Sequence, residues 1–338
     1  MKILLVTLTN IGDVILTTPV IANLFKKYPY ARLTVLAGPR AAGLFEGAPG
    51  IDRVIAYDKK SSLAEKWRLI LSLRREKFDQ VVDLRHTLIP ILLGHPAASL
   101  VYPLKNRKEL HCVDRHLAYL SRLGVETEEV YFIPRTHEAV HRVDELLSSK
   151  RVLPGEDIIV MSPGARSTLK TWTQEGFESV ARALTGKGYR IVWIGGSDDQ
   201  GLVGRLMQKA PKGNGHSWVS LCGETSLQEL AEVLRRIRLF IGTDSGPMHL
   251  ARAVGTMTVS IFGPTDPSTC APRGPGHRVV RLDLACSPCE KAQCPYHHEC
   301  MQNLGPEMVM RAATELLERD QKPVTRDQKI PETRYQST

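Results

Sequence analysis

The sequence has no long uninterrupted apolar segment. Its most apolar stretch, 88–104, contains three prolines and a histidine, which argues against a helix that crosses a bilayer. The apolar run at 3–8 (ILLVTL) is shorter than the apolar core of a secretory signal peptide. We therefore expect a cytoplasmic protein.

Aromatic residues are also scarce, at 6% of the chain, although the formal net charge is +9. The densest basic region, 53–77, holds eight basic and three acidic residues, but Trp67 is its one aromatic beyond Tyr57. That composition lacks the interleaved stacking residues of a nucleic-acid groove. A solvated helix face is the ordinary explanation, and an acidic ligand or an anionic membrane surface is the functional one.

Two common nucleotide motifs are missing as well. No G-x-G-x-x-G follows the first predicted strand, and no G-x-x-x-x-G-K-S/T occurs anywhere. Hydride transfer on a dinucleotide and P-loop chemistry are therefore disfavoured.

The length of 338 residues, with 42% hydrophobic and 24% charged residues, suits a globular chain of two domains. Apolar runs alternate with helical patterns, which predicts two α/β halves with parallel sheets. The polar segment KRVLPGED at 150–157 marks the boundary, giving domains at 1–152 and 153–320 and a flexible tail at 321–338. A helix at 136–149 precedes the boundary, and a final helix at about 305–319 is expected to fold back toward the first domain. The expected strands are 2–7, 32–37, 53–57, 79–84, 99–102, 158–161, 189–194, 218–221, 238–242, 257–262 and 278–282.

The segment 242–267 (GTDSGPMHLARAVGTMTVSIFGPTDP) carries the strongest functional signal. Asp244 and Ser245 are favoured N-cap residues after a strand, so a helix over Gly246–Val254 is predicted. Its free amides and positive dipole end suit a phosphate, and His249 adds a donor one turn in. The segment predicts half of a nucleotide site, although an ordinary capped helix has the same pattern.

The first predicted strand leads into a second turn of this kind. Asp13 lies where that strand gives way to a helix that runs through Phe25, with Pro19 inside its second turn. A carboxylate is favoured at such a helix start and should be ionised at neutral pH. It either caps the helix or takes a proton from a substrate.

Five short motifs occur in one order: GDVILTTP (12–19), PGA (163–165) followed by Lys170-x-Trp172, Gly-Gly-x-acid (195–198), DSGPMHLA (244–251) and FGPTDP (262–267). In this order and spacing the chain resembles the ADP-heptose lipopolysaccharide heptosyltransferases of glycosyltransferase family 9 over nearly its whole length. The resemblance implies a GT-B fold, in which two Rossmann-like doubly wound domains face a central cleft. It implies ADP-heptose as the donor and a Kdo-containing lipid A core, or its monoheptosylated form, as the acceptor. It also implies a peripheral location at the inner face of the inner membrane.

Donor contacts are expected in loops at the carboxyl ends of the second set of strands. Arg166, Ser167 and Lys170 follow one strand and suit a diphosphate, and the family's motif implies that Lys170 contacts the phosphates. Stacking of Lys170 on Trp172 is the local alternative. Asp198 follows the next strand, where it either binds ribose or caps a helix; the family usually has Glu there. Thr225 and Ser226 are expected to border the adenine.

The expected reaction is a single inverting displacement. Asp13 deprotonates the acceptor, while Lys170, the amides of Ser245 and Gly246, and His249 stabilise the departing ADP. No Asp-x-Asp pair is present, so neither a metal nor another cofactor is expected. Lys59, Lys60 and Arg68 of the basic region are the expected acceptor contacts, and no nucleic-acid partner is expected.

Four of the seven cysteines cluster as Cys286, Cys289, Cys294 and Cys300, with His297 and His298 inside the same loop. The spacing is compatible with a zinc or iron–sulfur site, with disulfides or with reduced thiols. Three other functions stay open for the whole chain: a family-9-like transferase with a different nucleotide sugar or acceptor, an epimerase of UDP-sugars, and an ADP-binding protein without catalysis.

Overall fold

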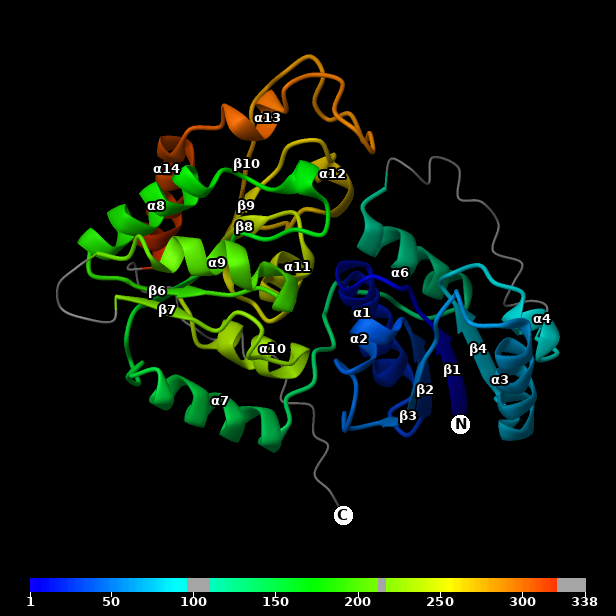
Figure 1. The fold of residues 1–338 in the computed structure, drawn as a ribbon. Helices are drawn as coiled ribbons and strands as arrows, with labels where there is room; N and C mark the ends of the chain where they lie inside the picture. Colours follow the sequence, from blue (N-terminus) through cyan, green and yellow to red (C-terminus); the bar gives the residue numbers. More distant parts are fainter. Residues whose placement is uncertain (96–109, 212–216, 321–338) are drawn as a thin grey trace.

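The computed structural model describes residues 1–95, 110–211 and 217–320, and within them the chain forms two parallel β-sheets flanked by helices (Figure 1). The alternating α/β class is confirmed. The expected strand at 99–102 and the tail at 321–338 lie outside the described residues.

The first sheet has the order β3-β2-β1-β4, and all its pairings are parallel. Its strands are β1 (Lys2–Val6), β2 (Arg32–Ala37), β3 (Ile51–Ala56) and β4 (Gln80–Asp83). The helices of this half are α1 (Ile11–Lys27), α2 (Pro39–Ala42), α3 (Leu63–Glu76), α4 (Ile89–Leu92) and α6 (Cys112–Arg122).

The second sheet has the order β10-β9-β8-β5-β6-β7 and is also parallel throughout. Its strands are β5 (Ile158–Ser162), β6 (Arg190–Trp193), β7 (Trp218–Ser220), β8 (Leu239–Thr243), β9 (Met257–Ile261) and β10 (His277–Val280). The remaining helices are α7 (His137–Ser149), α8 (Gln174–Gly186), α9 (Gln200–Met207), α10 (Leu227–Arg235), α11 (Gly246–Ala253), α12 (Pro267–Cys270), α13 (Glu299–Gln302) and α14 (Pro306–Asp320).

Each sheet reverses its strand order once, between β1 and β4 in the first and between β5 and β8 in the second. At such a reversal the connections on either side run in opposite directions, so the loops beyond the carboxyl ends of the two strands diverge and leave room for a ligand. The expected functional segments after β1, β5 and β8 all leave the sheets at these points.

Helix α1 passes through Pro19 without ending. Proline has no N–H to donate to the carbonyl of Ile15, but the Thr18 hydroxyl donates to that oxygen at 2.9 Å. The Thr17 hydroxyl does the same for Val14 at 2.6 Å. The Thr-Thr-Pro sequence thus carries its own compensation for the missing hydrogen bond.

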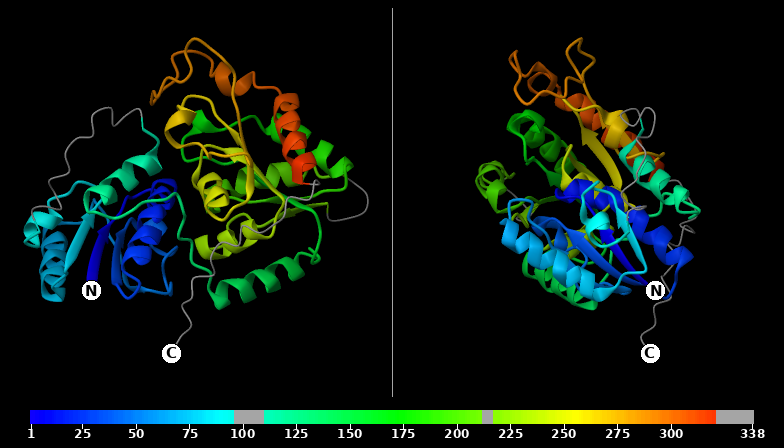
Figure 2. Two further views of the ribbon diagram at one scale, coloured as in Figure 1. Left: turned by 180° about the vertical axis from the view of Figure 1, so that it is seen from behind. Right: turned by 90° about the vertical axis from the view of Figure 1, so that its right-hand side faces the viewer.

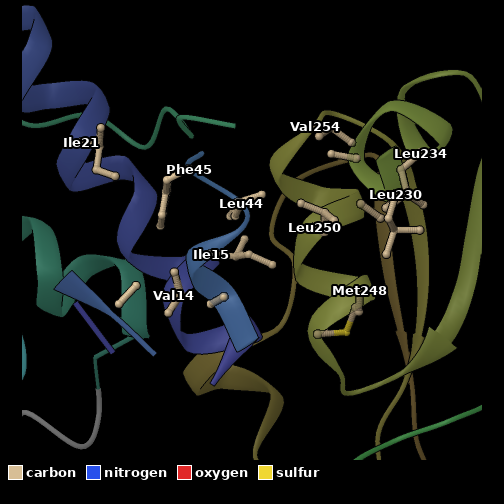
Figure 3. Packing of buried hydrophobic residues seen from close by; sticks show 14 of the residues in the cluster. Val14, Ile15, Ile21, Leu44, Phe45, Leu230, Leu234, Met248, Leu250 and Val254 are labelled. Atoms are coloured by element: carbon tan, nitrogen blue, oxygen red, sulfur yellow. The ribbon is translucent and has the colours of Figure 1, made fainter. Parts of the chain in front are cut away.

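One hydrophobic core continues from the first half into the second. In β1, Ile3 and Leu5 face this shared core, whereas Leu4 and Val6 face a separate cluster under α3, as the two-residue period of a strand requires. The shared core crosses between the halves where α1 meets α11. Figure 3 shows Ile15 of α1 and Leu250 of α11 pointing toward one another there.

Two helices depart from the expected arrangement. Helix α14 packs against α8 and strands β8 to β10 of the second half, so the expectation that it folds back toward the first domain is wrong. Its buried face supplies apolar partners to the outer face of that sheet. Helix α7 precedes the predicted boundary but packs against α10 of the second half (Figure 1). The boundary at 152 itself stays a prediction.

A buried carboxylate holds the segment before α7 against α10. Glu232 is 1% exposed and accepts two hydrogen bonds from Arg135, at 2.9 and 3.0 Å, and one from Arg236 at 2.8 Å. Burial by itself would raise the pKa of Glu232, but these guanidinium groups outweigh it and lower that pKa. Because Arg135 lies in the segment before α7, this ion pair ties that segment to α10 of the second half.

We therefore expect Glu232→Gln to lower the free energy of unfolding by about 3 kcal/mol, since it removes the charge that compensates the arginines. The native contribution depends on a lowered carboxyl pKa, so it is present above pH about 4.3 and is lost as the pH falls further. Urea unfolding at pH 7 and at a series of pH values from 4.5 to 3 measures both effects. Glu145→Gln, at a carboxylate that is 55% exposed, is the control and should change stability little; equal losses in both variants would contradict the assignment.

Candidate active site

The centre of the site is a buried carboxylate that follows β8. Asp244 is 7% exposed, and its Oδ2 accepts hydrogen bonds from the Lys170 ammonium at 2.6 Å and the Thr265 hydroxyl at 2.9 Å. The His249 Nε2 lies 3.7 Å from the other carboxylate oxygen. Burial would raise the pKa of Asp244, but the His249 imidazole and the Lys170 ammonium hold it far below its usual range.

The Lys170 contact bears on one alternative that the sequence left open. Lys170 reaches Asp244, and Trp172 is buried with its indole N–H donating to Leu304, so the alternative of Lys170 stacked on Trp172 is wrong. Helix α11 begins at Gly246 with Ser245 as the N-cap, as predicted. Its N-cap side chain makes no capping hydrogen bond, however, and the Asp244 carboxylate is used for the ion pair instead.

A cation could in principle be held by Asp244, His249 and Cys270, whose ligand atoms lie within 4.8 Å of one another. The Lys170 ammonium already occupies a position on the same carboxylate. Burial and the charge of Asp244 also raise the pKa of Cys270 to about 12, so its thiol keeps its proton. The Asp244 carboxylate is therefore paired with the Lys170 ammonium in this structure.

The two halves approach closely beside this carboxylate. A Cβ added at Gly12 would lie 2.7 Å from His249 Cδ2, and one at Gly246 would lie 3.0 Å from Ile11 Cγ2. The Gly12 distance is shorter than real Cβ contacts, and the Gly246 distance is tight enough that Ile11 would have to shift, so glycine at these two positions lets the starts of α1 and α11 lie in close contact. The first turn of α1, which contains Asp13, thereby comes next to the first turn of α11.

A hydrogen-bonded chain links the halves beside this contact. The Arg166 guanidinium donates to the Asn10 side-chain oxygen, and the Asn10 amide donates to Asp13 at 2.8 Å. Asn10 is the N-cap of α1, but its side chain makes no capping bond. The Asp13 carboxylate thus accepts from a side chain that also contacts the second half, and its role as helix cap or as base stays a prediction.

The α11 start offers donors without partners. The first N–H groups of a helix have no acceptor within that helix, and the Ser245 hydroxyl is buried with no hydrogen-bond partner among the described residues. Pro247 has no N–H, so the backbone N–H donors at this helix start are those of Ser245, Gly246 and Met248. An anion placed at this helix start would satisfy groups that the protein leaves unpaired.

The family model described as glycosyltransferase family 9 (heptosyltransferase) matches residues 66–300, more than half of the chain. The chain belongs to glycosyltransferase family 9. The matched residues include the loops after β5 and β8, whereas Asp13 lies before them.

This glycosyltransferase is 30% identical, over 284 residues, to lipopolysaccharide heptosyltransferase 3 of Escherichia coli, covering 75% of this chain and 81% of that one. It is 28% identical to lipooligosaccharide heptosyltransferase 2 of Campylobacter jejuni, covering 94% of this chain and 98% of that one. The solved structure of E. coli ADP-heptose lipopolysaccharide heptosyltransferase II superposes with a TM-score of 0.77 at 21% identity, covering 95% of this chain and all of that one. The GT-B fold class is thus confirmed.

In this family 9 enzyme, two neighbouring acids follow the Gly-Gly turn after β6, and the one that caps the next helix is not the one expected from the sequence. Asp199, not Asp198, is the N-cap of α9, and it accepts from the Gly196 N–H at 2.9 Å. Asp198 is exposed, so the helix-capping alternative for it is wrong. Its expected ribose contact stays a prediction.

The remaining predicted site residues lie in loops and helices of both halves. Ser167 precedes a short 3₁₀ turn at Thr168–Lys170, and Thr225 follows β7. The Ser226 hydroxyl caps α10 by accepting from Glu229. Lys59, Lys60 and Arg68 are exposed on the β3–α3 connection and on α3, in the first half.

Two site residues were missed by sequence reasoning. Asn10 connects Arg166 to Asp13, and Thr265 donates to Asp244 from the loop after β9. The sequence offered two signals for these residues: Thr265 lies in the FGPTDP motif, and Asn10 lies just before a predicted helix. Neither motif says which distant side chain will be its partner.

Removing the partner of the buried carboxylate tests the central ion pair. We expect Lys170→Met to lower the free energy of unfolding by about 2 kcal/mol at pH 7, because Asp244 loses its ammonium. The lowered carboxyl pKa stabilises the native state above pH about 4 and stops doing so as the pH falls. The difference from the unsubstituted protein should therefore shrink on acidification, as thermal unfolding across pH would show.

The matched control is Lys187→Met, at an exposed position after α8. It should leave both the stability and its pH dependence unchanged. A Lys170→Met difference that does not shrink at any pH below about 4 at which the protein still folds would show that the loss of stability does not come from the ion pair.

Proposed function

We propose that this protein transfers heptose from ADP-heptose to an inner-core acceptor of lipopolysaccharide, with inversion at the anomeric carbon. Membership of the heptosyltransferase family supports the reaction class. The names of the relatives give lipopolysaccharide or lipooligosaccharide as the product class, and one of them gives ADP-heptose as the donor. A Kdo-lipid A core, bare or already carrying one heptose, is the proposed acceptor.

The proposed grip on the donor follows from the unpaired groups at the α11 start. The diphosphate lies at Ser245 and Gly246, where free amides and the helix dipole favour negative charge. Lys170 is 31% exposed, so its ammonium reaches a ligand while it stays paired with Asp244. Arg166 and Ser167 border the phosphates, His249 adds its imidazole, and Asp198 and Thr225 contact the nucleoside.

In the proposed reaction Asp13 takes the proton of the acceptor hydroxyl while that oxygen attacks the anomeric carbon. The bond between that carbon and the diphosphate oxygen breaks in the same step, and its electron pair leaves with ADP. Lys170 and the α11 amides stabilise this developing charge. Asn10 fixes the Asp13 carboxylate through its 2.8 Å hydrogen bond, so the base is oriented before substrate arrives.

We propose that this step needs no metal. A metal would supply positive charge for the departing diphosphate. In this site the Lys170 ammonium, buried on one side against Asp244, supplies that charge at the loop where the diphosphate is proposed to lie.

The observation that carries the proposal is the contact between two helix starts, one with a base and the other with anion donors. Gly12 and Gly246 bring them together, and Arg166 spans from the donor loop to Asn10 beside Asp13. A sugar bound by its diphosphate at α11 would thus lie at the edge from which Asp13 can receive a proton.

The test is ADP release from ADP-heptose with Kdo-lipid A and with the monoheptosylated core as separate acceptors. We expect turnover with one of them. Asp13→Asn should lower kcat by about 10² to 10⁴, because it removes the general base, while the Kd for ADP stays within twofold. ADP binding is measured by calorimetry.

Asp52→Asn is the matched control. Asp52 lies in strand β3, is 51% exposed, and has its carboxylate 3.8 Å from the Arg32 guanidinium. It should turn over normally. Normal turnover of Asp13→Asn would remove Asp13 from this role, and a chain that binds ADP yet turns over neither acceptor would overturn the function.

We further propose that the outer side of α3 and α4 rests on an anionic membrane. Leu63, Trp67 and Leu71 repeat every four residues along α3 and are 75%, 57% and 52% exposed. Leu88 before α4 and Ile91 within it are 69% and 52% exposed. Both helices cover the same face of the first sheet, on the side away from the second half (Figures 1 and 2).

The charge of α3 selects the lipid. Lys66, Arg68, Arg74 and Arg75 share the helix with the apolar stripe, and Lys59 and Lys60 lie just before it. Apolar and basic side chains together are typical of helices that lie in an anionic interface. Among the described residues no helix is both long and apolar enough to span a bilayer, so attachment through this surface is the proposed mode.

We expect the double variant Leu63→Ser/Trp67→Ser to bind vesicles containing phosphatidylglycerol at least ~10-fold more weakly, because two apolar side chains no longer enter the interface. Co-sedimentation measures this, and added salt should weaken binding of the unsubstituted protein. Tyr30→Ser, at a side chain that is 94% exposed outside this surface, is the control. Equal binding by all three proteins would contradict the assignment.

A further inference from the structure

The loop between β10 and α13 gathers the four clustered cysteines at one cavity. Cys286, Cys289, Cys294 and Cys300 all line it, and its volume is about 200 Å³. The loop runs out from the second half at the top of Figure 1 and returns into α13. None of the seven cysteines is in a disulfide in this structure, so all four thiols are available as ligands.

The base of this loop is held in place by the backbone after β9. The Ser287 hydroxyl donates to the Gly263 carbonyl at 2.7 Å, and the N–H groups of Cys289 and Glu290 both donate to the Pro264 carbonyl at 2.9 Å. Cys286 and Cys289 flank this anchor. The first cysteine pair is therefore presented by a loop whose position is already set.

The far end of the loop is also fixed close to the same backbone. Cys300 is 8% exposed in α13, and a Cβ added at Gly263 would lie 3.1 Å from its sulfur. The absence of a side chain at Gly263 thus lets Cys300 approach the strand end where the first pair is anchored. Cys294 lies on the intervening loop and lines the same cavity.

We propose that these four cysteines bind a single zinc or iron ion through their thiolates. Gaps of two, four and five residues bring four soft ligands from one loop to one cavity, and a tetrathiolate set is typical of zinc or iron. No other donor type is needed to complete a tetrahedral site.

Binding releases the four thiol protons to solvent and leaves a doubly negative Zn²⁺ or Fe²⁺ tetrathiolate; Lys291, which also lines the cavity, faces that charge. In this structure no three of the sulfurs lie within 4.8 Å of one another. A tetrahedral site with 2.3 Å bonds needs sulfurs about 3.8 Å apart, so the metal draws the loop inward.

The ion acts on the loop and takes no part in sugar transfer. The His298 ring contacts the carbonyl of Leu169, the residue before Lys170. Tightening the cysteine loop therefore supports the turn that carries Lys170. This inference does not rest on the proposed function, because metal content is measured without any substrate.

The test is elemental analysis of the full chain, produced without a histidine tag in medium that contains both zinc and iron. We expect close to one zinc or iron ion per chain, and the element found identifies the metal. The metal content of the Cys289→Ser variant should be at least ~10-fold lower, because three thiolates hold the ion far more weakly than four. Cys112→Ser, a control outside the loop, should keep its metal.

A second measurement does not depend on the variant folding. In the unsubstituted protein, a strong chelator should make four additional thiols reactive and lower the thermal midpoint. Cobalt added back should give the intense visible absorption of a tetrahedral tetrathiolate. Less than ~0.1 metal ion per chain, with no change in thiol reactivity on chelation, would overturn the proposal. Loss of titratable thiols in the unreduced, denatured chain would overturn it in favour of disulfides.

Discussion

The structure depends on the contact between the starts of α1 and α11. The contact is this close because Gly12 and Gly246 carry no side chains: a Cβ at Gly12 would collide with His249, and one at Gly246 would push against Ile11. Around it, apolar side chains of both helices enter one shared core, so separating the halves would expose that core to water. The same contact brings a carboxylate at one helix start beside anion donors at the other. Stability and the active site therefore share one interface.

Within that interface the buried ion pair of Lys170 and Asp244 resolves a conflict between folding and function. A lysine that is proposed to bind a diphosphate needs to stay charged in a partly dry site, where an isolated ammonium would be costly. Asp244 offsets that cost before the donor arrives, and Thr265 and His249 support the carboxylate from two other segments. The charge is thus held in place by the fold, in the position where the leaving diphosphate is proposed to develop its own charge.

Sequence reasoning located most elements because each is encoded locally. The apolar runs of β1, β5 and β8 and the helical pattern of α1 are properties of a few neighbouring residues, and the loops with Asp13, Lys170 and Asp244 follow directly from them. It was wrong about α14 because an amphipathic helix shows that it has a buried face but not which surface covers it. It also missed that α7 packs on α10, since the ion pairs that join this part of the chain to α10 and its end, Arg135 with Glu232 and Arg236 with Asp144, link residues far apart in the sequence.

The sequence by itself determined the α/β alternation, the turns after the strands and the residue types that those turns carry. Hydrophobic period, capping residues and glycines act over a few positions, so they can be identified without knowing the fold. Only the tertiary structure decided the partners: Lys170 with Asp244, Arg166 with Asn10, and four cysteine sulfurs at one cavity. Those pairings depend on the order of strands in two sheets and on how closely two helices can approach, which are properties of the packed chain.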